Sequence, residues 1–122
     1  MSDETKELLT LAAKAMGFEV RGFSSAGNAI IKTPGGGPES CLVNEWNPLS
    51  SGEDLVEMEC QMSVEVIWAE DRCIATAWFS ERSFGAHELY SKHHSRSAVR
   101  AMASLRVVAE IGRRMGEEEW AK

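Results

Sequence analysis

Residues 45–54 place a strand end, a turn and a helix start in close succession, and they constrain the fold more than any other part of the chain. The Asn-Pro dipeptide in this stretch favours a turn, because proline disfavours helical backbone angles in the residue before it. Ser50 and Ser51 each stand three residues before an acidic residue, which is the spacing of a capping box at a helix N-terminus. We therefore predict a strand that ends at Trp46 and a helix that starts just after Ser51.

Hydrophobic periodicity and turn residues predict the other elements. The predicted helices cover residues 3–16, 52–62 and 95–115, with Gly17 and Gly116 as the glycines that end the first and the last helix. The predicted strands cover residues 18–23, 28–33, 41–46, 63–68 and 73–79. Turns are expected at 24–27 and 70–71, and residues 33–38 form a glycine-rich hairpin tip. Residues 80–94 show no clear period, and we expect only a short helical turn at 86–90.

These elements predict an α+β fold in a single domain that spans residues 1–122. We expect a mainly antiparallel sheet of four to five strands, sandwiched by about three helices. Neither face of the strands at 63–68 and 73–79 is strongly polar. Helices or a second subunit should therefore cover both faces of this hairpin.

The charge balance argues against two classes of partner. The chain has 19 acidic and 13 basic residues, which gives a formal net charge of −6. An acidic protein is poorly suited to neutralising phosphates, so we expect neither direct nucleic-acid binding nor electrostatic attachment to a membrane. The start of the sequence is acidic, where a signal peptide would be basic, and the apolar runs are short. We expect a cytoplasmic protein.

Neither a metal site nor a catalytic residue emerges from the sequence. The three histidines (His87, His93 and His94) are expected in the loop before the last helix, without a cysteine or carboxylate that completes a tetrahedral site. The three cysteines form no CxxC pair and fall at positions that are expected to be buried, where a thiol is unreactive. We therefore predict no catalytic residue, no metal and no cofactor, although an enzyme remains a third possibility behind two binding functions.

A candidate ligand site lies where the last helix begins. Arg96 and Arg100 gather positive charge there together with His93, and a helix N-terminus adds its own partial charge. An anionic ligand is one interpretation of this cluster. A solvated helix face with ion pairs one turn apart is the other.

Two of the four tryptophans, Trp68 and Trp78, stand on the predicted hairpin of residues 63–79. If they pair across the two strands, one face of the sheet carries a wide aromatic patch. Such a patch is part of the core, a subunit interface or a ligand pocket.

The Trp-Asn-Pro-Leu segment at 46–49, followed by Asp54-Leu55 and a strand hairpin, resembles the bacteriophage and prophage proteins grouped as the phage ABA sandwich domain. Residues 8–17 look like the first helix of that family, and residues 97–100 with 109–113 look like its closing helix. The resemblance implies a small phage-encoded protein with a central sheet between helical layers and no established biochemical role. It carries over no functional residue. Residues 33–38 and 80–94 are longer than the family pattern.

Two functions from different classes follow. The first is a non-enzymatic accessory protein of a phage or prophage that acts in the host cytoplasm. It binds a host or phage protein, and a homodimer is one candidate assembly. The alternative is a protein that binds or sequesters a small anionic, nucleotide-like molecule. Its ligand-binding residues would be Arg96, Arg100, His93, Trp68 and Trp78.

Overall fold

The computed structural model describes residues 2–32 and 43–120, with the backbone alone for residues 43 and 116–120. Three α-helices, six strands and one short 3₁₀ helix follow one another along these residues. In chain order they are α1 (Asp3–Ala15), β1 (Glu19–Phe23), β2 (Ala29–Lys32), β3 (Val43–Trp46), α2 (Gly52–Gln61), β4 (Glu65–Trp68), β5 (Arg72–Phe79), β6 (Arg82–Leu89), η1 (Tyr90–Lys92) and α3 (Arg96–Trp120).

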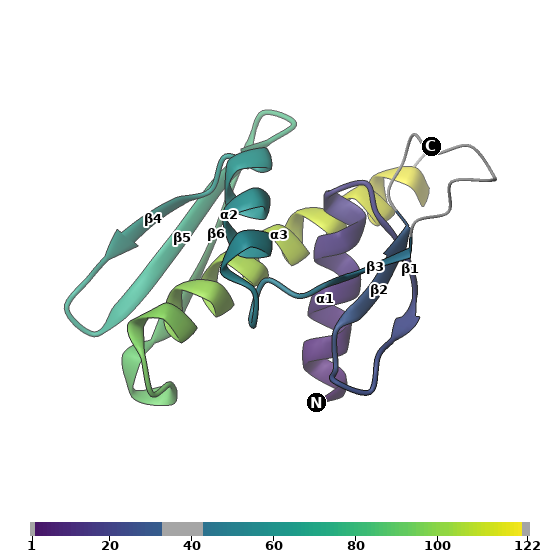
Figure 1. The fold of residues 1–122 in the computed structure, drawn as a ribbon. Helices are drawn as coiled ribbons and strands as arrows, with labels where there is room; N and C mark the ends of the chain where they lie inside the picture. The colour runs from purple at the N-terminus through teal and green to yellow at the C-terminus, as the bar shows by residue number, and fades with distance from the viewer. Residues whose placement is uncertain (1, 33–42, 121–122) are drawn as a thin grey trace.

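The strands form two separate antiparallel sheets, each of three strands in the order of the sequence. The predicted α+β class is confirmed, but the prediction of one sheet of four to five strands is wrong. The physical reason is that the packed pair α1 and α3 lies between the two groups of strands, so that each half builds its own sheet from consecutive strands. Figure 1 shows the sheet β1–β3 at one end of the molecule and the sheet β4–β6 at the other.

The long helix α3 runs between these two halves (Figure 1). It packs on β5 and β6 along one part of its surface and on α1 along another, while α1 also contacts β1 and β2. The helices therefore lie between the sheets, instead of covering one sheet on both faces as the sequence predicts. Most side chains in the middle of α3 are buried for this reason, and Leu105, Val107, Val108 and Ile111 are all fully enclosed.

The prediction that Gly17 ends the first helix is confirmed. Gly17 has a φ of +83°, in the left-handed region that glycine adopts without a steric penalty. The amide of Gly17 donates to the carbonyl of Lys14, and the amide of Phe18 donates to that of Ala13. This pair of bonds is a Schellman motif, which satisfies carbonyl groups at the helix end and turns the chain into β1.

The Asn-Pro turn and the cap after it also form as predicted. Ser51 is the N-cap of α2, and its side chain accepts a bond of 3.2 Å from the amide of Asp54. The carboxylate of Asp54 reaches back to the amide of Asn47 at 3.0 Å and not to the amide of Ser51. The Asn47 side chain is buried, donates to Asn28 at 3.0 Å and accepts from the amide of Leu49 at 2.9 Å. Asn47 thus ties the turn to the first sheet.

Two predictions about the second half are wrong. Residues 82–89 form the strand β6, although the sequence predicts no strand there and a helical turn at 86–90; the 3₁₀ helix begins only at Tyr90. The helix α3 continues past Gly116 instead of ending there. Helices were one of two covers predicted for both faces of the β4–β5 hairpin; within the described residues, no helix covers the outer face, where Trp78 is 71% exposed. A second subunit as the cover stays a prediction. The predicted hairpin tip at 33–38 and Cys41 lie outside the described residues.

The closest approach between α1 and α3 occurs at Gly112. A Cβ atom built on Gly112 would lie 1.8 Å from the carbonyl oxygen of Leu11, where no real Cβ atom is found. The obstacle is backbone, which cannot rotate away as a side chain does. Only glycine at this position therefore allows the two helices to pack at this distance.

We predict that Gly112→Ala destabilises the protein by at least about 3 kcal/mol, because overpacking against backbone forces α1 away from α3. Alanine favours an isolated helix by about 1 kcal/mol over glycine, so helix propensity alone would make the Gly112→Ala variant more stable. A loss of stability therefore indicates the packing contact. The measurement is the free energy of unfolding in urea. Gly52→Ala is the matched control, since a Cβ at Gly52 meets nothing within 4 Å. A stable Gly112→Ala variant would contradict the observed helix contact.

Candidate functional site

Arg100, a predicted ligand residue, is held by a buried carboxylate. Its guanidinium donates two bonds of 3.0 and 2.9 Å to Glu59 of α2, and Ser104 donates a third bond of 2.7 Å to the same carboxylate. The bonds to Glu59 raise the pKa of Arg100 above its ordinary value. Glu59 is 6% exposed, so this ion pair joins α2 to α3 in a place that is mostly closed to water. Because its guanidinium already bonds to a carboxylate, Arg100 would bind an anionic ligand only weakly.

His93, a second predicted ligand residue, also faces a carboxylate. Its Nε2 atom lies 3.0 Å from the buried Glu88 of β6, whose other oxygen accepts a bond of 2.9 Å from Arg106. Arg106 then donates to Glu4 of α1 at 3.1 Å. Burial by itself raises the pKa of Glu88, but the bonds and charges of His93 and Arg106 outweigh it. The pKa of Glu88 therefore lies below its ordinary value.

Arg96 and Trp68 do come together as the alternative function requires. The guanidinium carbon of Arg96 lies 5.6 Å from the centre of the Trp68 ring and 5.1 Å from the centre of the Tyr90 ring. The Tyr90 hydroxyl donates to the carbonyl of Ala69, which fixes the ring beside the β4–β5 turn. Arg96 has no carboxylate partner among the described residues and lines a cavity of about 250 Å³ with Tyr90 and His93. Among the described residues, the guanidinium is held by these two cation–π contacts.

Trp78, the fifth predicted site residue, lies on the other face of the sheet. In the β4–β5 register Trp68 stands opposite Cys73, which is buried and faces α3. Trp78 is five residues after Cys73 on β5, so its side chain lies on the opposite face, beside Ser83 of β6. The two tryptophans therefore do not form one aromatic patch.

The outer face of β4–β6 nevertheless carries large apolar side chains among polar ones. Ile67 of β4 is 53% exposed and stands opposite Ile74 of β5, while Trp78 is 71% exposed farther along the same face. Ile74 and Thr76 are half-buried between them. Among the described residues, Ile67 and Trp78 are two of the four exposed large apolar side chains, and their position on one uncovered face indicates a surface that meets another molecule.

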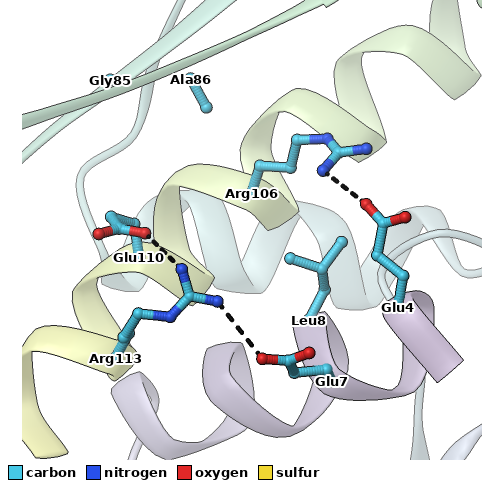
Figure 2. A pocket seen from close by; sticks show the side chains of 8 residues that line it. All are labelled: Glu4, Glu7, Leu8, Gly85, Ala86, Arg106, Glu110 and Arg113. Carbon is cyan, nitrogen blue, oxygen red and sulfur yellow. Dashed lines mark hydrogen bonds and ion pairs between the residues drawn. The ribbon is translucent and has the colours of Figure 1, made fainter.

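A charged cleft lies between β6, α1 and α3 (Figure 2). Its volume is about 330 Å³, and the backbone of Gly85 and Ala86 borders one side. Two arginines of α3 bridge to α1 across it: Arg106 bonds to Glu4, and Arg113 lies 3.5 Å from Glu7 and 3.1 Å from Glu110. Figure 2 shows these two bridges side by side, with Leu8 between them.

Sequence reasoning placed some reactive groups wrongly. Cys60 is exposed, contrary to the prediction, whereas Cys73 is buried as predicted, and burial raises the pKa of its thiol. His87 lies on β6 and not in a loop. Across residues 2–32 and 43–120, no group of three or more His, Cys, Asp or Glu side chains is placed to hold a metal ion.

The sequence analysis also missed Glu59 and Glu88 as structural residues. Glu59 does carry a signal, because it shares one side of α2 with Leu55, Met58 and Met62, and a carboxylate on an apolar helix face indicates a buried ion pair. Glu88 carries no comparable signal, since its strand was not predicted.

Comparisons with known proteins add no relative to this picture. No protein-family model, no curated protein and no solved structure matches the chain. The resemblance to the phage ABA sandwich domain therefore stays a prediction. In the part of the chain that the structure describes, no helix is long and apolar enough to cross a membrane.

We predict that Glu88→Gln lowers the free energy of unfolding by roughly 1–3 kcal/mol near pH 7, because it removes the charge that Arg106 and His93 face. The pKa of folded Glu88 lies below its ordinary value of 4.5, so ionised Glu88 stabilises the fold above that pH. This stabilisation is lost as the pH falls through the folded-state pKa. The two proteins should therefore converge in stability as the pH falls from 4.5 through the lower folded-state pKa of Glu88.

Urea unfolding at a series of pH values measures this convergence. Glu57→Gln serves as the control, since Glu57 is an exposed glutamate on α2 and its change should cost less than about 0.5 kcal/mol. A Glu88→Gln penalty that stays constant down to strongly acidic pH would show that the carboxylate charge is not the stabilising feature.

Proposed function

We propose that this protein is a non-enzymatic binding module whose outer β4–β6 face docks on a segment of another protein. The observation that supports the proposal is the exposure of Trp78 at 71% and Ile67 at 53% on one uncovered face. Aromatic side chains are enriched at the centres of protein interfaces, where they bury a large area at a low cost in conformational entropy.

The size of this face favours a segment over a second copy of the chain. Three strands about 4.8 Å apart, the longest of them eight residues long, have a flat footprint of roughly 350 Å². A stable interface between two folded proteins buries about 800 Å² of accessible surface on each partner, so this face by itself would supply only part of one. A helix or a short extended segment of a partner matches the smaller area. The homodimer that the sequence suggested is therefore the weaker proposal for this face.

The charges around the face favour a basic partner. Glu65 lies exposed on the outer face itself, and Glu70 and Glu81 lie exposed in the two turns that border it, against one exposed arginine, Arg82, beside Glu81. Arg72 stands on this face as well, but Asp71 accepts two bonds from its guanidinium at 3.0 and 2.9 Å. The partner segment should thus carry apolar side chains for Trp78 and Ile67 and lysine or arginine residues at its margins.

The biological setting is part of the same proposal. The Trp-Asn-Pro-Leu segment supports a phage or prophage origin, and the acidic charge of −6 supports action against a basic surface in the host cytoplasm. An accessory protein of this kind would block or recruit host or phage machinery by occupying the surface that it binds.

A second candidate function rests on Arg96. Its guanidinium lies on two aromatic rings beside a cavity of about 250 Å³, an arrangement that suits a small planar anion such as a nucleotide. A thermal-melting screen with nucleotides tests this candidate: a true ligand raises the melting temperature of the wild type, and Arg96→Gln abolishes the rise. Arg100 and His93 contribute less, because Glu59 and Glu88 already pair with them.

We predict that Trp78→Ser abolishes partner binding and leaves the fold stable, because a side chain that is 71% exposed contributes little to the core. The measurement is affinity purification from host-cell lysate with wild type and variant in parallel. Wild type should retain one stoichiometric protein, less of it as salt is raised, and the variant should lose it. Light scattering of the purified protein should give the mass of a monomer.

The matched control is Val56→Ser, which removes an apolar side chain of α2 that is 57% exposed. It should bind the partner as the wild type does. Equal binding by the Trp78→Ser variant would dismiss the outer face as the docking surface, and a dimer that Trp78→Ser dissociates would replace the foreign partner with a second copy.

A further inference from the structure

The strand β6 offers a free edge in the middle of its length. It is the last strand of its sheet, and β5 is its only neighbour in the part of the chain that the structure describes. The amide of Tyr90 donates to the carbonyl of Asp71, so these two residues form a hydrogen-bonded pair. Hydrogen-bonded and non-bonded pairs alternate along antiparallel strands. The next hydrogen-bonded pair is therefore Glu88 with Cys73, and every second residue of β6 from Glu88 back bonds to β5. The residues between them (Ser83, Gly85 and His87) therefore turn their amide and carbonyl groups outward.

Of these three residues, Gly85 lines the charged cleft of about 330 Å³, together with its neighbour Ala86. The opposite side of the cleft is formed by Glu4, Glu7 and Leu8 of α1, and its floor is the surface of α3 (Figure 2). Both β6 and α1 pack on α3. In the described part of the chain, the unpaired edge of β6 thus faces α1 across a channel whose floor is α3.

Gly85 is a strand residue without an internal reason to be glycine. A Cβ at this position would meet its nearest neighbours, Ala75 and Thr76, at 3.9 Å, which is an ordinary contact. Glycine weakens a strand, and inside a strand it often marks a place where another backbone comes close. The fold gains nothing from this glycine, whereas an approaching chain gains access to the strand edge.

We propose that the channel between β6 and α1 binds an extended segment of a partner protein, which adds to the sheet as a fourth strand beside β6. The segment would exchange backbone hydrogen bonds with Gly85 and its outward neighbours Ser83 and His87. Every second side chain of the segment would face the floor of the channel, and this alternation would provide the specificity.

The wall of the channel argues against a second copy of this chain as the occupant. In an edge-to-edge dimer, the β6 of the other copy would bring its own β5 along, about 4.8 Å farther out. That place lies toward α1, whose Glu4, Glu7 and Leu8 close the channel. A single extended chain avoids this collision.

The charges in the channel indicate a basic segment. Three carboxylates line it against two guanidinium groups, and Arg106 is further engaged by the buried Glu88. The weakest bridge joins Arg113 to Glu7 at 3.5 Å, with the two side chains 47% and 64% exposed. A lysine or arginine of the segment would take Glu7 from this bridge at little cost, because an exposed pair contributes little stability.

This inference concerns a different surface from the Trp78 face and does not depend on it. The test begins with a displayed library of random short peptides, selected on the wild-type protein. Selected peptides should be rich in β-branched and basic residues. One of them is then titrated into wild type, Gly85→Pro and Gly85→Ala by calorimetry.

Proline at 85 removes only an amide that points away from β5, so the strand pairing survives. The Gly85→Pro change should raise the Kd of the peptide by at least about tenfold. It removes the hydrogen bond from the amide of residue 85 to the peptide and places a proline ring where the peptide would lie. Gly85→Ala keeps the amide and should bind within a few-fold of the wild type. Trp78→Ser should also bind, which separates this site from the outer face.

Hydrogen exchange on the wild type keeps the proposal testable if the proline variant unfolds. The amides of Gly85 and His87 should exchange rapidly in the free protein and become protected with the peptide bound. Failure to select any peptide, equal binding by a folded Gly85→Pro variant, or unchanged exchange at both amides would overturn the proposal.

Discussion

The rest of the structure depends on the contact between α1 and α3 at Gly112. Because the helices meet backbone to backbone there, they form one inner layer, and each sheet packs on the outside of this layer. A sheet in that position buries only one face fully, which explains why β5 alternates small buried residues such as Ala75 and Ala77 with half-buried ones and the exposed Trp78. The uncovered face that carries Trp78 is thus a direct consequence of the helix contact.

The buried carboxylates explain how the electrostatics of the surface arise. Glu59 pairs with Arg100, and Glu88 pairs with Arg106 and with His93 just before α3. Two arginines of α3 that the sequence predicts on an exposed helix face are therefore already bonded to carboxylates of the same protein. A carboxylate that loses its water must be paired, and the arginines on α3 are the groups within reach. These pairs take two carboxylates and two guanidinium groups, so the other charged groups still carry the net charge of −6. The acidic balance therefore supports binding to a basic partner more than capture of an anion.

How far the sequence predicts this structure depends on whether the signal is local. The cap at Ser51 and the glycine end at Gly17 were predictable, because neighbouring residues determine both. The strand β6 was not, because its turn uses Ser80 and Glu81 at φ values of +52° and +65°, a geometry usually marked by asparagine or glycine. The two-sheet arrangement depends on contacts between distant segments. The meeting of Arg96 with Trp68 could be suspected, but the capture of Arg100 by Glu59, 41 residues earlier, could not.

The two proposed surfaces share β6, and this has a consequence for the area available to a partner. Side chains of a strand alternate between faces, so a segment seated beside β6 would direct half of its side chains into the channel and half onto the outer face. The outer face would then widen by one strand, next to Ser83, which stands opposite Trp78. A surface of roughly 350 Å² that is too small for a folded partner would grow by about a third. A partner with an extended arm beside a folded body could therefore use the arm to build the surface on which its body docks.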